Sequence, residues 1–215
     1  MATNLKGKKV LITAGPTWVP IDSVRVISNT ATGKTGILLA DSLARQGAKV
    51  TLLLGPVGAY SVNKKVKIID FKFFDELNYR LKGELKKRKY AAVIHAAAVS
   101  DYKLNAASRK KISSHKQCLN LTLKQTPKII NALRKLSPGS FLVGFKFEPD
   151  LAGKKLILKA RGLFKRARLD LVAANSRYKK HYIAYLVSAK NECGPFLSKE
   201  KMVKGLAGLI GEGCA

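Results

Sequence analysis

A glycine- and threonine-rich turn is the first place where residue types and spacing suit chemistry. Gly33–Thr35 match the end of a phosphate-binding P-loop, but the full motif needs glycine where Ser28 stands. A GxGxxG dinucleotide motif likewise needs glycine where Ala31 stands. What remains is a turn at Thr32 that enters a helical pattern and offers backbone N–H groups, a favourable dipole and Lys34 to a phosphate. An ordinary glycine-bearing helix start is the alternative.

A run of small residues forms a second candidate site. Ala96, Ala97 and Ala98 follow a short apolar segment, and their size lets a flat ligand approach the backbone closely. Asp101 could then accept hydrogen bonds from ribose hydroxyls. Tight packing of a helix on a sheet, with a solvated aspartate, explains the same residues equally well.

A basic stretch, residues 109–114, is the third candidate. It follows a polar segment and reads as a mobile loop whose lysines could close over a phosphate during a reaction. A solvated basic loop is the alternative. Metal chemistry has less support, because His95, His115 and His181 show no metal-ligand spacing with one another or with the cysteines.

The elements that must position these residues alternate between strand and helix. The apolar runs Lys8–Ala14, Val50–Leu54 and Ala91–His95 predict buried strands, and Gly33–Gln46 and Phe74–Leu85 show helical spacing between them. We expect Ile37, Leu38, Ala40, Leu43 and Ala44 to form the buried face of the first helix. Right-handed crossovers make this order an α/β fold, with a mostly parallel sheet and helices on both faces.

The second half of the chain continues the pattern less regularly. A short antiparallel excursion is expected at Leu119–Leu123, and Thr126 is expected to cap a helix in which Pro127 is the first residue. That helix is predicted over Lys128–Leu136. A basic helix to about Arg168 and a last helix at Lys199–Ile210 are also expected, and the further strands are Phe141–Phe145, Leu169–Ala173 and Tyr182–Val187. Ligands of open parallel sheets bind beyond the carboxyl ends of the strands, here after Gly15, Gly55, Ala96, Phe145 and Asn175.

Composition excludes several classes of protein. The 215 residues are 47% hydrophobic, enough for a core, and we expect a single domain over residues 1–215. No apolar run is long enough for a membrane span or a signal peptide, and three scattered cysteines suit the reducing cytoplasm. The net charge of +28 attracts polyanions, so a basic nucleic-acid-binding protein on this scaffold is an alternative. No nucleic-acid recognition motif is present, and nucleic acid is not the expected partner.

Several segments taken in order resemble the phosphopantothenate–cysteine ligases of coenzyme A biosynthesis. The resemblance implies a Rossmann-like sheet with a flap beside the antiparallel excursion. The matching segments are VLITAGPT (10–17), IDSVRVISN (21–29), ATGKTG (31–36), AAAVSDY (96–102), KKISS (110–114), LTLKQTPKII (121–130), VGFKFE (143–148) and LDLVAAN (169–175).

The resemblance implies a two-step ligation. A nucleoside triphosphate, CTP in preference to ATP, activates the carboxylate of 4′-phosphopantothenate with Mg²⁺ present, and pyrophosphate leaves. The amine of cysteine then displaces the nucleotide from the acyl-nucleotide intermediate. Such chemistry needs stabilisation of charge at the α-phosphate and positioning of two anionic reactants.

The same resemblance assigns site residues. Asn29 falls on an asparagine expected to hydrogen-bond the acyl-nucleotide, and Lys111 on a catalytic flap lysine near the reacting phosphate. The expected nucleotide-binding residues are Gly15, Thr32, Gly33, Lys34, Ala96, Ala97, Asp101, Lys111, Pro127, Lys128, Ile129, Ile130 and Phe145. No metal ligands are assigned.

At four positions the chain differs from residues that members of this family carry. Ser113 and Ser114 stand where some members carry flap lysines, and Leu163 and Ala167 stand where bifunctional members carry helix lysines. The resemblance implies a homodimer formed near Leu119–Leu123 and the flap. The first expected strand begins at residue 8, so we expect no flavin-dependent decarboxylase domain upstream. Either the gene is monofunctional, with a separate decarboxylase as partner, or this chain is half of a bifunctional enzyme.

Overall fold

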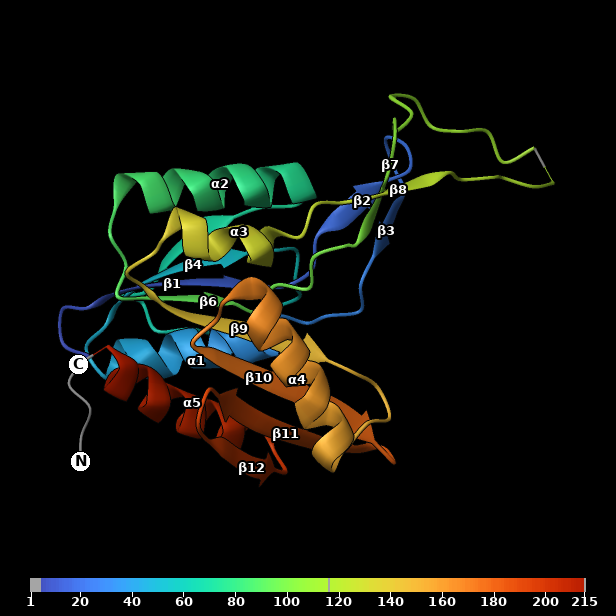
Figure 1. Ribbon diagram of the computed structural model, residues 1–215. Helices are drawn as coiled ribbons and strands as arrows, with labels where there is room; N and C mark the ends of the chain where they lie inside the picture. The colour runs from blue at the N-terminus through green and yellow to red at the C-terminus, as the bar shows by residue number, and fades with distance from the viewer. Residues whose placement is uncertain (1–4, 116, 215) are drawn as a thin grey trace.

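An eight-stranded sheet forms the centre of the computed structural model, which describes residues 5–115 and 117–214 (Figure 1). The strands lie in the order β12-β11-β10-β9-β6-β1-β4-β5. From β10 to β5 all neighbours are parallel, while β11 and β12 are added antiparallel at one edge. Their bounds are β1 Lys9–Ala14, β4 Lys49–Leu54, β5 Lys67–Asp70, β6 Ala92–His95, β9 Phe141–Phe147, β10 Leu171–Tyr178, β11 His181–Ser188 and β12 Glu192–Phe196.

Helices cover both faces of this sheet. On one face lie α1 (Lys34–Arg45) and α5 (Lys199–Gly213); on the other lie α2 (Phe74–Lys87), α3 (Ile129–Leu136) and α4 (Gly153–Ala167). Strand β1 shows why two layers are needed, because Val10 and Ile12 pack toward α1 and α5 while Leu11 packs toward α2. The predicted α/β class with a mostly parallel sheet is confirmed.

An arm projects from the carboxyl edge of the sheet (Figure 1). It consists of the antiparallel pairs β2 (Trp18–Pro20) with β3 (Val26–Ser28) and β7 (Tyr102–Leu104) with β8 (Leu123–Gln125). The segment between β7 and β8, residues 105–122, is the flap. The hairpin of β2 and β3 lies in a stretch that the sequence presents as a loop. The antiparallel excursion exists, but its strand is Leu123–Gln125 and not Leu119–Leu123.

Two local predictions are wrong for identifiable reasons. Thr126 does not cap α3; its hydroxyl donates instead to the carbonyl oxygen of Ser100 at 2.7 Å, and the helix begins at Ile129 with Lys128 as N-cap. Pro127 therefore precedes the helix. In α1 it is Leu39, and not Leu38, that is fully buried. Among the described helices, none has the length and apolar character needed to cross a membrane.

Candidate active site

Glycines bring the start of α1 against the end of β1. Gly15 and Gly33 have φ values of 79° and 70°, a region that favours glycine. A Cβ on Gly33 would lie 2.9 Å from Val57 Cγ1 and 3.3 Å from the backbone nitrogen of Gly15. One turn into the helix, a Cβ on Gly36 would lie 2.4 Å from that of Ala14. The N-terminus of α1 is therefore held at the carboxyl edge of the sheet by contacts that side chains would prevent.

The helix N-terminus itself offers mainly backbone groups. No side chain caps α1, and the Lys34 N–H lies 3.5 Å from Thr32 Oγ1. The Lys34 ammonium group lies 3.1 Å from Glu200 Oε1 of α5, so this side chain is engaged by a carboxylate. Unsatisfied N–H groups and the helix dipole attract an anion at this point.

The small-residue run lies beside this turn. The N–H of Ala96 donates to the Thr13 carbonyl oxygen at 3.0 Å, that of Ala97 to Thr13 Oγ1 at 3.2 Å, and that of Ala98 to the Gly15 carbonyl oxygen at 2.9 Å. These bonds extend the pairing of β1 with β6 beyond the strand ends. Two of the three candidate segments, far apart in sequence, thus form one surface.

Asn29 joins the same surface from the arm. It follows β3, is exposed, and its Nδ2 donates to the Ala98 carbonyl oxygen at 2.9 Å. The amide oxygen of Asn29 is left for a ligand, and the side chain is oriented by a fixed backbone partner.

His95 lies beneath this surface as a neutral residue. It is fully buried at the end of β6, and its Nδ1 lies 2.9 Å from Thr13 Oγ1. Burial lowers the pKa of His95 to about 4, because the charged imidazolium loses its hydration. His95 is therefore part of the core beneath the candidate site.

Asp101 connects the small-residue run to the start of α3. Its Oδ1 lies 2.5 Å from Lys128 Nζ, and its carbonyl oxygen accepts from the Thr126 N–H at 2.8 Å. The Asp101 side chain is 56% exposed, so a ribose hydroxyl can still reach it. These contacts place the segment that leads into α3 next to Asp101.

Gly144 of β9 lies close to the side chains of Ile130 in α3 and of Leu169. A Cβ on Gly144 would lie 2.8 Å from Ile130 Cδ1 and 2.5 Å from Leu169 Cδ1, so a larger residue at this point of β9 would require these side chains to move. Phe145 follows it on the opposite face of the sheet, half-buried against the α1 and α5 layer. Ile129 is buried, so it can act on a ligand only through its backbone.

The flap lysine is positioned by a clamp that sequence reasoning missed. The Ile112 N–H donates to Asp22 Oδ2 at 3.0 Å, and Arg25 Nη2 donates to the Ile112 carbonyl oxygen at 2.9 Å. Arg25 also binds Asp22 Oδ2 at 2.5 Å. Arg25, and next the N–H of Ile112, hold the pKa of Asp22 far below its usual range. Lys111 is exposed beside this clamp.

Asn29 and Lys111 lie on the same arm but do not touch. Arg25, which holds the flap beside Lys111, is four residues from Asn29 along the β3 side of the hairpin, or about 13 Å in an extended strand. The two side chains therefore lie along the same hairpin and flap, at different positions of one arm.

The departures on α4 have a structural explanation. Leu163 and Ala167 are buried against the sheet, whereas Lys165 and Arg166 are exposed. The apolar residues here extend the core and leave α4 with its cations on the solvent side.

The described residues offer no dedicated metal cage. No three His, Cys, Asp or Glu side chains among residues 5–115 and 117–214 come together as ligands. The two carboxylates that ion pairs place near this surface, Asp101 and Glu200, are each engaged by a lysine, Lys128 and Lys34. The residues present therefore do not fit a protein-held magnesium ion.

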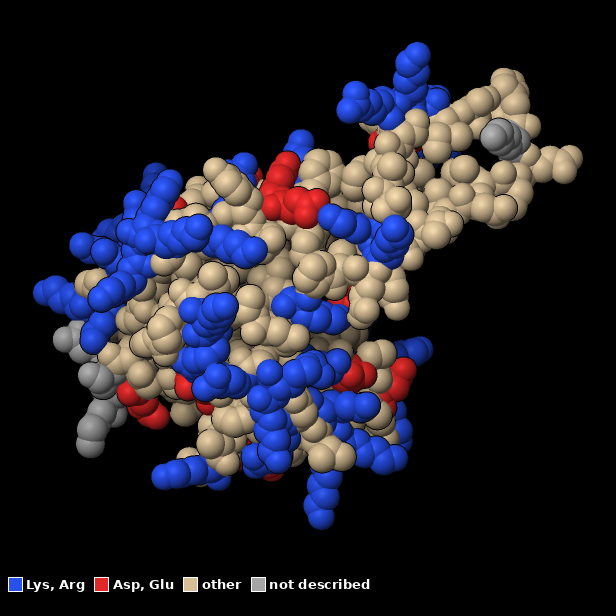
Figure 2. All heavy atoms as spheres, turned by 45° about the horizontal axis from the view of Figure 1, so that its top comes forward, with Lys and Arg blue, Asp and Glu red and all other residues tan. Residues whose placement is uncertain are grey.

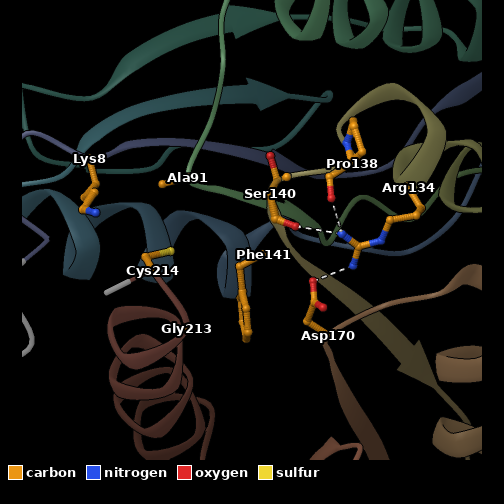
Figure 3. A pocket seen from close by; sticks show the side chains of 10 residues that line it. Lys8, Ala91, Arg134, Pro138, Ser140, Phe141, Asp170, Gly213 and Cys214 are labelled. Atoms are coloured by element: carbon orange, nitrogen blue, oxygen red, sulfur yellow. Dashed lines mark hydrogen bonds and ion pairs between the residues drawn. The ribbon is translucent and has the colours of Figure 1, made fainter.

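A hollow of about 500 Å³ lies at the opposite, amino-terminal edge of the sheet (Figure 3). Arg134 reaches across it to the carbonyl oxygens of Pro138 and Ser140, each at 3.0 Å, and to Asp170 Oδ2 at 2.6 Å. Asp170 also accepts from the Leu142 N–H at 2.7 Å. These groups satisfy one another and anchor the starts of β9 and β10. None of the predicted site residues lines this hollow.

Comparisons with known proteins agree with the sequence resemblance. The bifunctional coenzyme A biosynthesis protein CoaBC of Thermococcus kodakarensis is 42% identical over 175 residues, which cover 80% of this chain and 42% of that protein. The chain thus spans less than half the length of this curated relative.

Solved structures show the same fold. The DNA/pantothenate metabolism flavoprotein from Streptococcus pneumoniae matches with a TM-score of 0.83 and 26% identity, over 95% of this chain and 98% of that one. A Cab2 mutant in complex with phosphopantothenate-cysteine matches with a TM-score of 0.76 and 19% identity, over 96% and 87% of the two chains. The model of one family, the DNA/pantothenate metabolism flavoprotein C-terminal domain, matches residues 5–205. The chain belongs to that family.

Proposed function

We propose that this chain joins 4′-phosphopantothenate to L-cysteine through an acyl-nucleotide intermediate, in coenzyme A biosynthesis. The observation that carries the proposal is the surface where Gly15, Ala96–Ala98, Asn29 and the uncapped start of α1 meet. It combines small residues that let a ligand approach the backbone, anion-binding N–H groups and one oriented amide. The relative from Thermococcus kodakarensis, named for coenzyme A biosynthesis, supports the same conclusion.

In the first step a carboxylate oxygen of 4′-phosphopantothenate forms a bond to the α-phosphorus, and the bond from that phosphorus to pyrophosphate breaks. Negative charge grows on the departing pyrophosphate. The N-terminus of α1 and Lys111 suit that charge, the first as a fixed dipole and the second as an ammonium group on a movable flap.

In the second step the cysteine nitrogen forms a bond to the acyl carbon, and the bond from that carbon to the nucleotide oxygen breaks. The nucleoside monophosphate leaves and the amine loses a proton. Asn29 is suited to holding the acyl-nucleotide in place, because its Nδ2 is fixed on the Ala98 carbonyl oxygen.

We assign the nucleotide to CTP in preference to ATP, following the resemblance. Asp101 would accept from the ribose, Phe145 would lie beside the base, and Pro127 to Ile130 would contact the nucleotide from the start of α3. Mg²⁺ belongs to the proposal as an ion that accompanies the triphosphate, since Mg²⁺ is commonly held by substrate phosphates. A cytoplasmic homodimer that works with a decarboxylase, on the same chain or a separate one, completes it.

The test is pyrophosphate release with 4′-phosphopantothenate and Mg²⁺, measured with CTP and with ATP. We expect release with CTP to exceed that with ATP. Replacing Lys111 with glutamine should lower kcat by about 100- to 1000-fold, the usual cost of removing one group that stabilises transition-state charge. Lys110→Gln, an exposed neighbour on the same flap, is the matched control and should stay close to wild type.

Equal rates for Lys111→Gln and Lys110→Gln would remove Lys111 from the mechanism. Absence of pyrophosphate release with either nucleotide would reject the ligase itself.

A further inference from the structure

A second functional surface lies at the amino-terminal edge of the sheet, away from the candidate active site. Lys9, Lys49 and Lys67 are the first residues of the neighbouring strands β1, β4 and β5. The end of α2 lies beside them, because Glu84 of α2 lies 3.6 Å from Lys67, and the Ala91 N–H just after the helix donates to the Lys9 carbonyl oxygen at 2.8 Å. Figure 2 shows Lys and Arg side chains gathered over this end of the molecule. The basic rim consists of Lys9, Lys49, Lys67, Lys86, Lys87 and Lys89.

Positive charge on this rim is poorly compensated. Lys9 and Lys49 are register partners on adjacent strands, a placement of like charges that costs stability. Glu84 lies 3.6 Å from Lys67 and is shared with Arg88. In the part of the chain that the structure describes, no carboxylate lies within 4.0 Å of the other five rim lysines.

The carboxyl edge is different. Four of its lysines are paired with carboxylates: Lys34 with Glu200, Lys103 with Asp75, Lys128 with Asp101 and Lys146 with Glu148. The helix dipole accounts for cations at the end of α2, since they favour a helix C-terminus. It does not account for Lys9 and Lys49, which begin strands. The like-charged pair Lys9 and Lys49 therefore needs another explanation.

The chemistry of the rim indicates which polyanion it fits. None of its described residues is a large exposed apolar side chain, so it has no group to insert into a lipid surface. It also lacks aromatic rings on which unpaired bases could stack. What it offers is a row of ammonium groups on rigid elements, which suits the phosphate backbone of a double helix.

We propose that the basic rim binds double-helical nucleic acid through its phosphates, without sequence preference, while the opposite edge of the sheet stays free. This surface is independent of the ligase proposal. It also fits the lack of a recognition motif in the sequence, because phosphate contacts carry no sequence information.

The experiment is fluorescence anisotropy of a labelled DNA duplex of about 20 base pairs, titrated at salt concentrations from about 50 to about 200 mM. The rim variant carries Lys9→Gln, Lys49→Gln, Lys86→Gln and Lys87→Gln. The matched control removes the same charge elsewhere, through Lys154→Gln, Lys155→Gln, Lys159→Gln and Lys204→Gln, all exposed residues of α4 and α5.

Each phosphate contact contributes about 0.9 to the slope of log K against log salt, so the rim variant should lose up to about 3.6 of that slope. The control should keep the wild-type slope, and thermal melting should show both variants folded. An equal loss in the control, or no binding by the wild type at about 100 mM salt, would overturn the proposal. Tighter rim-dependent binding to phosphatidylserine vesicles than to the duplex would assign the rim to a membrane instead.

Discussion

At the scale of single residues, His95 shows how a titratable group is kept neutral beneath the candidate site. It ends β6, one of the central strands, and its ring is in contact with Thr13 of β1. Burial holds the pKa of His95 at about 4, below the value near 6.5 of an exposed histidine.

This depressed pKa predicts a loss of stability in acid. Between pH 6.5 and 4 the unfolded chain binds a proton at His95 that the folded chain does not, so the free energy of unfolding falls as pH falls. The loss should be on the order of 3 kcal/mol once the pH is below about 4. Denaturant titrations across this range should show a shallower pH dependence for His95→Gln.

Asp22 and Glu84, whose pKa values are lowered, add to the loss at lower pH, so the difference between variant and wild type is the quantity to compare. Parallel curves for the two proteins would contradict a neutral buried His95.

At the scale of elements, the contact between the β2–β3 hairpin and the flap controls where Lys111 can go. Asp22 and Arg25 bind both backbone polar groups of Ile112, and the Ser108 N–H donates to the Ile21 carbonyl oxygen at 3.0 Å. The flap is thus fixed at Ser108 and Ile112, and the described residues that follow, 113–115 and 117–122, are exposed.

Asp22→Asn should weaken this clamp and lower the rate of pyrophosphate release by about 10- to 100-fold, as expected for a misplaced catalytic group. The effect should fall on kcat more than on KM. In the Lys111→Gln background the same substitution should lower the rate little further, because both substitutions remove the same contribution, that of Lys111. Asp41→Asn, which breaks a comparable pair with Arg45, is the control.

Rescue by Asp22→Glu would support positioning. Losses that simply multiply in the double variant would mean that Asp22 supports the fold and not Lys111.

Elements buried on both faces were predictable, and those on the arm were not. Lys9–Ala14 and Lys49–Leu54 are continuous apolar runs because helices cover both sides of them. Strands β2 and β3 have three residues each, and Val26 and Ile27 are exposed, so no burial pattern marks them. Their position depends on the turn at Asp22 and Arg25.

Some residues of the candidate site were likewise predictable from the sequence, and others were not. Gly15, Ala96 and Asp101 follow strand ends, so the rule for parallel sheets predicted that they share an edge. The bond between Asp22 and Ile112 joins residues 90 positions apart in irregular segments, for which the sequence has no periodic signal. The engagement of Lys34 by Glu200 depends on how α5 packs beside α1, which the strand order alone does not give.

At the scale of the whole molecule, the arm leaves apolar side chains in water. Val24 is 67% exposed, and Leu119, Leu121 and Leu123 are exposed as well. A second copy of the chain would cover such a surface, in line with the proposed homodimer.

Sedimentation velocity should therefore show a dimer, and Leu121→Ser with Leu123→Ser should raise its dissociation constant by about tenfold or more. Leu158→Ser, at a residue that is 72% exposed on α4, should leave the dimer intact. A monomeric wild type, or a double variant that dimerises as well as Leu158→Ser, would contradict assembly through the arm.

The six strands from β10 to β5 run in the same direction, so the sheet has one edge of strand N-termini and an opposite edge of strand C-termini. A strand such as β4, with six residues, separates the two ends by about 20 Å of stiff backbone. We therefore expect mutations that change the charge at the amino-terminal edge to leave the geometry of the candidate site at the carboxyl edge unchanged. Lysines at the amino-terminal edge could be gained or lost during evolution without a change in turnover at the carboxyl edge. The surface charge and the catalytic rate can therefore evolve independently.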